Sequence, residues 1–273
     1  MFDSASWKLE RNKNAQMNEG ISEEEIQRYW DSASDNCPKI FLTDFMNKVL
    51  DLLFDIGSMG SEDTILDIGS GPGSYALEMS KRVKHVTCLD STPGMLKIVD
   101  KRCKENNVNN VSTILEDWRK YVPKSVYDVA FTSMCPVTNN PESLEKMEKC
   151  ATRKCIYLSV LHNEGDSIQR KVWKALGKDY SSNSNDSRYI LNYLKEEGRN
   201  ARLDTLTREK RTTVGVEDMI QRELNSFKIY KYDELKLDAI IRSIVEPMSK
   251  NGILELDENL CVGIITWSPP KHE

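Results

Sequence analysis

Several features are scarce or missing in this chain of 273 residues, and each absence excludes a class of protein. The longest apolar runs, such as residues 260–267, are too short to span a bilayer. The first residues lack the apolar core of a signal peptide, and Phe2 stands where myristoylation needs glycine. Seven scattered cysteines form no disulfide framework. We therefore expect a cytoplasmic protein that has no membrane partner.

An excess of positive charge is missing as well. Lys and Arg total 38 against 43 Asp and Glu, which gives a formal net charge of −5. Broad binding to a phosphate backbone needs a basic surface, so this balance disfavours a nucleic-acid partner. The best candidate for a local basic patch, residues 199–211, is interleaved with Asp204 and Glu209 and fits the solvated face of a strand.

The sequence offers little for a metal centre. Cys150 and Cys155 bracket the expected end of a helix and start of a strand, without a second pair of ligands. A structural zinc ion takes four such ligands, so we expect no metal.

What the sequence does contain is a regular alternation of strands and helices. Such an alternation predicts a doubly wound, mostly parallel sheet covered on both faces, that is, an α/β fold. Helices expected near 167–176 and 216–248 interrupt the alternation, and we interpret them as a cap over the binding edge. The expected strands are residues 64–68, 85–89, 111–115, 127–132, 155–160, 201–213 and 260–267.

A glycine-rich turn follows the first of these strands. It reads Asp67-Ile68-Gly69-Ser70-Gly71-Pro72-Gly73 and precedes a helical segment. Glycines there allow positive φ and close approach of a ligand, and the free N–H groups at the helix start favour negative charge. A dinucleotide site usually has the spacing G-x-G-x-x-G. Here the spacing differs, and Asp67 stands where a cationic amino-acid moiety could be held.

Polar groups end the next strands as well. Asp90 follows the second strand about twenty residues after Gly69, where a carboxylate accepts hydrogen bonds from ribose hydroxyls. Glu116-Asp117-Trp118 follows the third strand, where an acid could accept from an adenine amino group and the indole could lie on the ring. Residues 133–136, Ser-Met-Cys-Pro, follow the fourth strand at the crevice where such sheets bind ligands. Each element alone also fits an ordinary turn.

Taken together, these motifs resemble the class I S-adenosylmethionine-dependent methyltransferases. The resemblance rests on residues 64–82, 86–96, 115–118 and 126–136 and covers the centre of the chain. It implies a seven-stranded sheet of order 3-2-1-4-5-7-6 whose last strand is antiparallel. It also implies a helical segment over residues 1–58 that covers the site, a cofactor-binding core over 59–161, and the remaining sheet with its cap insertions over 162–273.

The resemblance assigns the cofactor residues. Asp67 and the turn would line the methionine part, Asp90 the ribose, and the residues after the third strand the adenine, while Tyr29 and Trp30 would lie in a helix that closes over the site. The cofactor set is Asp67, Gly69, Ser70, Gly71, Pro72, Gly73, Asp90, Ser91, Met95, Glu116, Asp117, Trp118, Ser133 and Met134.

The acceptor side is less well defined by the sequence. His162, after the fifth strand, is the histidine best placed as a general base, and Tyr29, Trp30, Cys135 and Trp173 are candidates for substrate contact. We expect an enzyme that moves a methyl group from S-adenosylmethionine to a small molecule. A protein or RNA methyltransferase, a dinucleotide-dependent oxidoreductase and a catalytically idle cofactor-binding module stay open as alternatives. The chain lacks an Asn-Pro-Pro-Tyr motif after the fourth strand, so methylation of base amino groups is not supported.

Overall fold

The computed structural model describes residues 3–17, 20–34, 43–164, 168–178 and 187–270. The helices are α1 (Ser4–Met17), α2 (Glu23–Ser34), α3 (Thr43–Asp55), α4 (Ser74–Ser80), α5 (Pro93–Glu105), α6 (Pro141–Cys150), α7 (Ile168–Ala175), α8 (Ser187–Glu196), α9 (Val216–Phe227) and α10 (Glu234–Val245). The strands are β1 (Thr64–Ile68), β2 (His85–Asp90), β3 (Val111–Leu115), β4 (Tyr127–Ser133), β5 (Ala151–Glu164), β6 (Arg202–Gly215) and β7 (Ile253–Trp267). Short 3₁₀ turns lie at Pro136–Thr138, Lys228–Tyr230 and Glu246–Met248.

The strands form one seven-stranded sheet of order β3-β2-β1-β4-β5-β7-β6. Strands β1 to β5 pair in parallel, whereas β7 runs antiparallel to both β5 and β6. This confirms the doubly wound α/β class and the strand order that the resemblance implied. Strands β1 and β3 also have the bounds that the sequence predicted.

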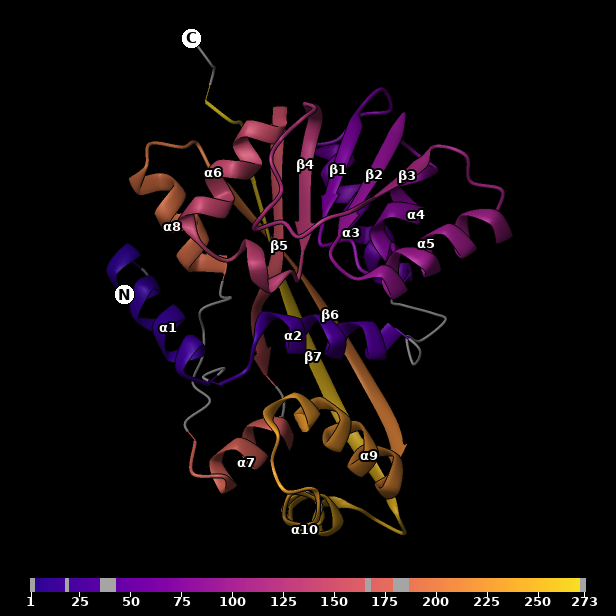
Figure 1. Cartoon of the computed structure of the whole chain (residues 1–273), viewed down its shortest axis with the longest axis vertical. Coiled ribbons are helices and arrows are strands. Elements are labelled where there is room, and N and C mark those ends of the chain that lie inside the picture. Colours follow the sequence, from indigo (N-terminus) through magenta and orange to yellow (C-terminus); the bar gives the residue numbers. More distant parts are fainter. Residues whose placement is uncertain (1–2, 18–19, 35–42, 165–167, 179–186, 271–273) are drawn as a thin grey trace.

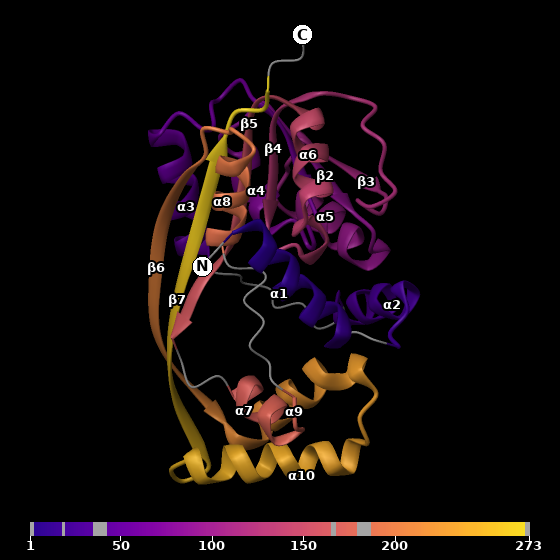
Figure 2. The same cartoon turned by 90° about the vertical axis from the view of Figure 1, so that its left-hand side faces the viewer.

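Helices cover both faces of the sheet (Figures 1 and 2). On one face α3, α4 and α5 bury side chains such as Val49, Met79 and Val99 against the strands. On the other face α1, α6 and α8 cover the sheet, with Trp7 and Met147 in the core. The two apolar layers hold the carboxyl ends of β1 to β4 at one edge, and this edge carries the predicted cofactor residues.

Helix α1 is an element that the sequence pattern did not reveal. Its composition is mostly polar, but Trp7 is 1 % exposed, donates Nε1–H to Asn139 Oδ1 at 3.2 Å and packs against Tyr193. One aromatic side chain therefore anchors the helix, and one residue is too few to produce a periodic signal.

The long strands β6 and β7 carry a separate lobe. They continue as a two-stranded ribbon beyond the end of β5, with Gly215 paired to Ile253. At the far end α7, α9 and α10 pack on the ribbon around their own apolar core, which includes Trp173, Ile220 and Ile241 (Figure 2). We call these three helices and the ribbon end the cap. No helix in the described ranges is both long and apolar enough to cross a membrane.

Candidate active site

The glycine-rich turn is fixed by its neighbours on β2 and in the loop after β4. Gly69, Gly71 and Gly73 all have φ between +53° and +73°, a region that favours glycine. Gly69 N–H donates to the Leu89 carbonyl at 2.8 Å, and a Cβ at Gly69 would lie 2.2 Å from Cys135 Sγ. Gly73 begins α4 in the left-handed conformation. The backbone conformation of the turn therefore requires glycine, as the sequence indicated.

Asp67 lies immediately before this turn with its side chain buried. It is 2 % exposed, and no hydrogen bond or ion pair from the described residues reaches its carboxylate. Burial, together with the charge of Asp90, raises the pKa of Asp67 to about 8. Burial and the Asp67 charge also raise the pKa of Tyr75. A buried carboxyl without a cationic partner fits an ammonium group of a ligand.

Asp90 ends β2 and is oriented by two backbone donors. Gly71 N–H donates to Oδ2 at 2.8 Å and Thr92 N–H donates to Oδ1 at 2.9 Å. A carboxylate has about four lone-pair positions, so each oxygen keeps capacity for a further donor. The same side chain therefore ties the glycine-rich turn to the start of α5 and presents acceptors at the sheet edge, as a ribose diol requires.

The turn after β3 places its three predicted residues differently. Glu116 is exposed, and its N–H donates to the Asp90 carbonyl at 3.1 Å. Asp117 accepts hydrogen bonds from Arg119. Trp118, in contrast, is 2 % exposed and stacks on Tyr121 with ring centroids 5.8 Å apart. Trp118 is thus a core residue that anchors the turn and does not present its ring to a base.

The loop after β4 lies beside the glycine-rich turn. Met134 is 46 % exposed and has φ of 53°, which is uncommon for a side chain of this size and marks a constrained backbone at the edge. Half-buried Ser133 precedes it. Cys135 packs against Gly69, and burial raises the pKa of its thiol to about 12. A thiol that stays protonated is a poor nucleophile, so Cys135 fits a packing role under the turn better than substrate contact.

The structure differs from the sequence-based expectation at two predicted acceptor-side residues. The sequence placed His162 after the fifth strand, but β5 continues to Glu164 because β7 extends its pairing, and the His162 backbone pairs with Cys261. The side chain of His162 lies outside the described part of the chain. Trp173 is 2 % exposed in the cap core and contacts Phe227 and Tyr230 at centroid distances of 4.7 Å, so it packs and does not line a pocket.

Helix α2 is bonded to the loops that carry the cofactor residues, which the sequence did not reveal. It begins with a capping box, in which Ser22 and Glu25 accept hydrogen bonds from each other's backbone N–H. Gln27 Nε2 donates to the carbonyl of half-buried Ser91 at 2.7 Å, and Lys231 of the cap lies 2.6 Å from Glu25. Tyr29 and Trp30, predicted on this helix, pack edge to face at 5.3 Å. Only contacts far apart in sequence identify this helix as a bridge between core and cap.

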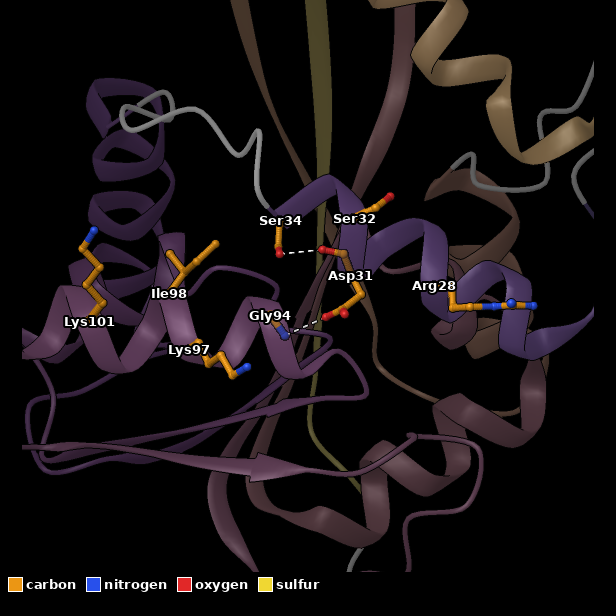
Figure 3. Close-up of a pocket in the computed structure, with 8 residues that line it drawn as sticks. All are labelled: Arg28, Asp31, Ser32, Ser34, Gly94, Lys97, Ile98 and Lys101. Atoms are coloured by element: carbon orange, nitrogen blue, oxygen red, sulfur yellow. Dashed lines mark hydrogen bonds between the residues drawn. The ribbon is translucent and has the colours of Figure 1, made fainter.

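A groove of about 550 Å³ opens between α2 and α5 (Figure 3). Asp31 Oδ1 accepts from Gly94 N–H at 2.8 Å, and Ser34 Oγ–H donates to the Asp31 carbonyl. The groove uses the outer face of α5, because the opposite face, including Met95, packs inward. The lining residues are Arg28, Asp31, Ser32, Ser34, Gly94, Lys97, Ile98 and Lys101.

Comparison with known proteins agrees with this geometry. Residues 65–154 match the family model described as a methyltransferase domain. A solved S-adenosylmethionine-dependent methyltransferase of Thiobacillus denitrificans, in complex with S-adenosyl-L-homocysteine, is 14 % identical, with a TM-score of 0.53 over 87 % of this chain and 96 % of that one. The YcgJ protein of Bacillus subtilis is also 14 % identical, with a TM-score of 0.54 over 82 % of this chain and 100 % of that one. At these identities the structures establish the fold.

Two curated relatives match part of the chain. A probable cobalt-precorrin-6B C(15)-methyltransferase (decarboxylating) of Methanococcus vannielii is 34 % identical over 110 residues, 40 % of this chain and 59 % of that protein. An uncharacterized protein of Haemophilus influenzae is 24 % identical over 153 residues, 55 % of each chain. The chain therefore spans little more than half the length of these relatives.

The strand order, the glycine-rich turn after β1 and the acid at the end of β2 together define the class I methyltransferase fold. Residues 65–154 match a methyltransferase domain, and the fold is that of the class I S-adenosylmethionine-dependent methyltransferases. The cofactor of this family is S-adenosylmethionine.

Proposed function

We propose that this protein transfers the methyl group of S-adenosylmethionine to a small-molecule acceptor. The observation that carries the proposal is the buried Asp67 carboxyl, which has no cationic partner among the described residues and lies directly before a turn held open by three glycines. The methionine part of the cofactor brings an ammonium group, which would satisfy this carboxyl. Asp90 would accept from the ribose hydroxyls through the lone pairs that the backbone donors leave free.

The bound cofactor supplies an electrophilic methyl group on its sulfonium. What this chain adds is binding and orientation, which account for much of the rate in transfers of this kind. The constrained backbone at Ser133 and Met134 would line the edge beside the turn. A general base is required only if the acceptor must lose a proton, and His162 stays the predicted residue for that role.

A small-molecule acceptor is favoured over a polymer by two features. The formal charge of −5 disfavours a phosphate backbone. Helix α2 also lies along the carboxyl ends of the strands, with the cap beyond it, and elements on that side of the sheet suit a small acceptor better than a polymer (Figure 1). The substrate named for the Methanococcus vannielii relative is not carried over, because that match covers 40 % of this chain.

Calorimetric titration with S-adenosylmethionine, S-adenosylhomocysteine and NADH tests the cofactor assignment. We expect the first two to bind and NADH not to bind, and binding of NADH alone would exclude the proposal. Formation of S-adenosylhomocysteine with small molecules, peptides or RNA as acceptors then separates the rival activities. Absence of turnover with all three acceptor classes would favour an idle cofactor-binding module.

The Asp90→Ala variant tests the ribose assignment. We expect its affinity for S-adenosylhomocysteine to fall about tenfold to a hundredfold, because hydrogen bonds to charged groups contribute about 1.5–3 kcal/mol. The alanine also frees the Gly71 and Thr92 N–H groups, so Asp90→Asn is the matched variant that keeps the shape. Unchanged affinity in both variants, with circular dichroism that matches wild type, would contradict the assignment.

A further inference from the structure

The turn after β3 is held rigidly beside Asp90. Glu116 N–H donates to the Asp90 carbonyl, and the N–H groups of Lys120 and Tyr121 both donate to the Asp117 carbonyl at 2.8 Å. Lys146 Nζ donates to the carbonyl of buried Trp118 at 2.7 Å. The backbone of Asp117 is therefore fixed relative to the ribose-binding carboxylate.

The Asp117 side chain is fixed as well, and by one neighbour. Arg119 donates its backbone N–H and its Nε–H to Oδ1 at 2.9 and 3.0 Å. It also donates Nη2–H to Oδ2 at 2.6 Å, with a longer Nε contact to that oxygen at 3.1 Å. Three donor groups therefore bind the carboxylate, with Nε shared between the two oxygens, and one of its about four lone-pair positions stays free. Hydrogen bonds from Arg119 also lower the pKa of Asp117.

Arg119 reaches a third partner outside the turn. Its Nη1 contacts the Glu23 carboxylate in the first turn of α2. The side chain of Arg119 is 42 % exposed and that of Asp117 is 17 % exposed, so the guanidinium lies between solvent and the carboxylate. A planar guanidinium that engages two carboxylates has its orientation fixed by both, which a lysine in its place could not achieve.

We propose that Arg119 is a positioning residue that orients the Asp117 carboxylate to accept a hydrogen bond from the 6-amino group of the cofactor's adenine, and thereby selects amino-purines over oxo-purines. The inference rests on the proposed function. A hypoxanthine base has a carbonyl oxygen where adenine has the amino group, so it would bring an acceptor against the free lone-pair position of the carboxylate. Arg119 fixes the direction of the Asp117 carboxylate, and Glu23 holds Arg119 in place.

The test compares two ligands that differ at this position, S-adenosylhomocysteine and S-inosylhomocysteine, by calorimetry. For wild type we expect S-adenosylhomocysteine to bind about a hundredfold more tightly than the inosine analogue. In Arg119→Ala we expect the affinity for S-adenosylhomocysteine to fall about tenfold and the affinity for the analogue to stay almost unchanged. The tenfold loss corresponds to one charge-assisted hydrogen bond. Lys120→Ala is the matched control, because it removes a neighbouring positive charge whose ammonium makes no hydrogen bond to Asp117.

Arg119→Lys separates charge from orientation. It keeps the positive charge but cannot donate two parallel hydrogen bonds, so we expect a selectivity between that of wild type and that of Arg119→Ala. Because Arg119→Lys also keeps most of the side-chain packing, it can replace Arg119→Ala in the test if the alanine variant fails to fold.

The outcomes are distinguishable. The inference would be overturned if the Arg119 variants lost affinity equally for both ligands, that is, if the ratio of the affinity for S-adenosylhomocysteine to that for S-inosylhomocysteine stayed unchanged. The arginine would then only stabilise the turn. Failure of wild type to bind S-adenosylhomocysteine would overturn the proposed function instead. If Lys120→Ala lowered this affinity ratio as much as Arg119→Ala does, the selectivity would depend on net charge. That result would also contradict the positioning role.

Discussion

The cofactor edge and the cap are built by different means. At the edge, strands β1 to β3 are five or six residues long, and backbone N–H groups of the glycine-rich turn and of Thr92 fix the carboxylate of Asp90. In the cap, helices pack through aromatic and aliphatic side chains on a ribbon whose strands have 14 and 15 residues. The edge therefore depends on backbone geometry, which tolerates little variation, whereas the cap depends on packing, which can change with the acceptor.

The cap should be separable from the edge by one core substitution. Trp173→Ala removes a side chain that is 2 % exposed and contacts three aromatic rings, so we expect a destabilisation of about 3–5 kcal/mol confined to the cap. Hydrogen exchange should show faster exchange in α7, α9 and α10, with β1 to β4 unchanged. Affinity for S-adenosylhomocysteine should stay within about twofold of wild type because the cofactor edge lies in another core.

Trp267→Ala is the matched control, since Trp267 is equally buried but belongs to the core of the sheet. We expect it to destabilise the sheet and to lower cofactor affinity. A tenfold loss of cofactor affinity in Trp173→Ala would show that cap and edge form one cooperative unit.

Asp67 provides a pH test of the edge. Its folded pKa of about 8 lies above the usual value of 3.8, so protonation stabilises the folded state. Stability from this group is full below about pH 4, falls as the pH rises and is lost above about pH 8. Asp67→Asn should remove this dependence, so the variant should gain stability over wild type as pH rises, by on the order of a few kcal/mol in urea titrations.

The same carboxyl should release a proton when ligand binds. An ammonium group beside Asp67 lowers its pKa, so binding of S-adenosylhomocysteine near pH 7 should release close to one proton. Calorimetry in buffers of different ionisation enthalpy measures that number, and Asp67→Asn should release none. Asp128→Asn, on β4 beside the start of β1, is the control of opposite sign for the pH dependence of stability. Bonds from Thr64 lower the pKa of Asp128, so its contribution is lost as pH falls. Release of no proton by wild type would contradict the ammonium assignment.

The two regions also differ in how far the sequence predicts them. The glycine spacing, Asp67 and Asp90 depend on local backbone geometry, and β1 and β3 have their predicted bounds. Trp118 and Trp173 look like ligand-binding aromatics in the sequence, but burial against Tyr121 and Phe227 makes them core residues. The sequence does not predict a role for Arg119, because that role depends on a contact with Glu23, which lies 96 residues away in the chain. Contacts of this range leave no periodic pattern in the sequence.

The smallest expected effect concerns the bridge between the regions, where α2 approaches α5 at Gly94. A Cβ there would lie 2.4 Å from Ser34 Oγ and 2.7 Å from Asp31 Oδ1, both side-chain atoms that can move. Gly94→Ala should therefore displace α2 slightly and weaken its bond from Gln27 to Ser91, for a cost of about 1 kcal/mol, or roughly fivefold in affinity for S-adenosylhomocysteine. Thermal stability should rise or stay constant, because alanine favours the helix. Gly177→Ala, in the cap, has open space around its Cβ but is strained by a φ of +72°, so it should destabilise the cap locally and leave cofactor affinity unchanged. If Gly94→Ala binds as tightly as wild type, α2 is not part of the cofactor site, and the cap and the edge communicate through the ribbon alone.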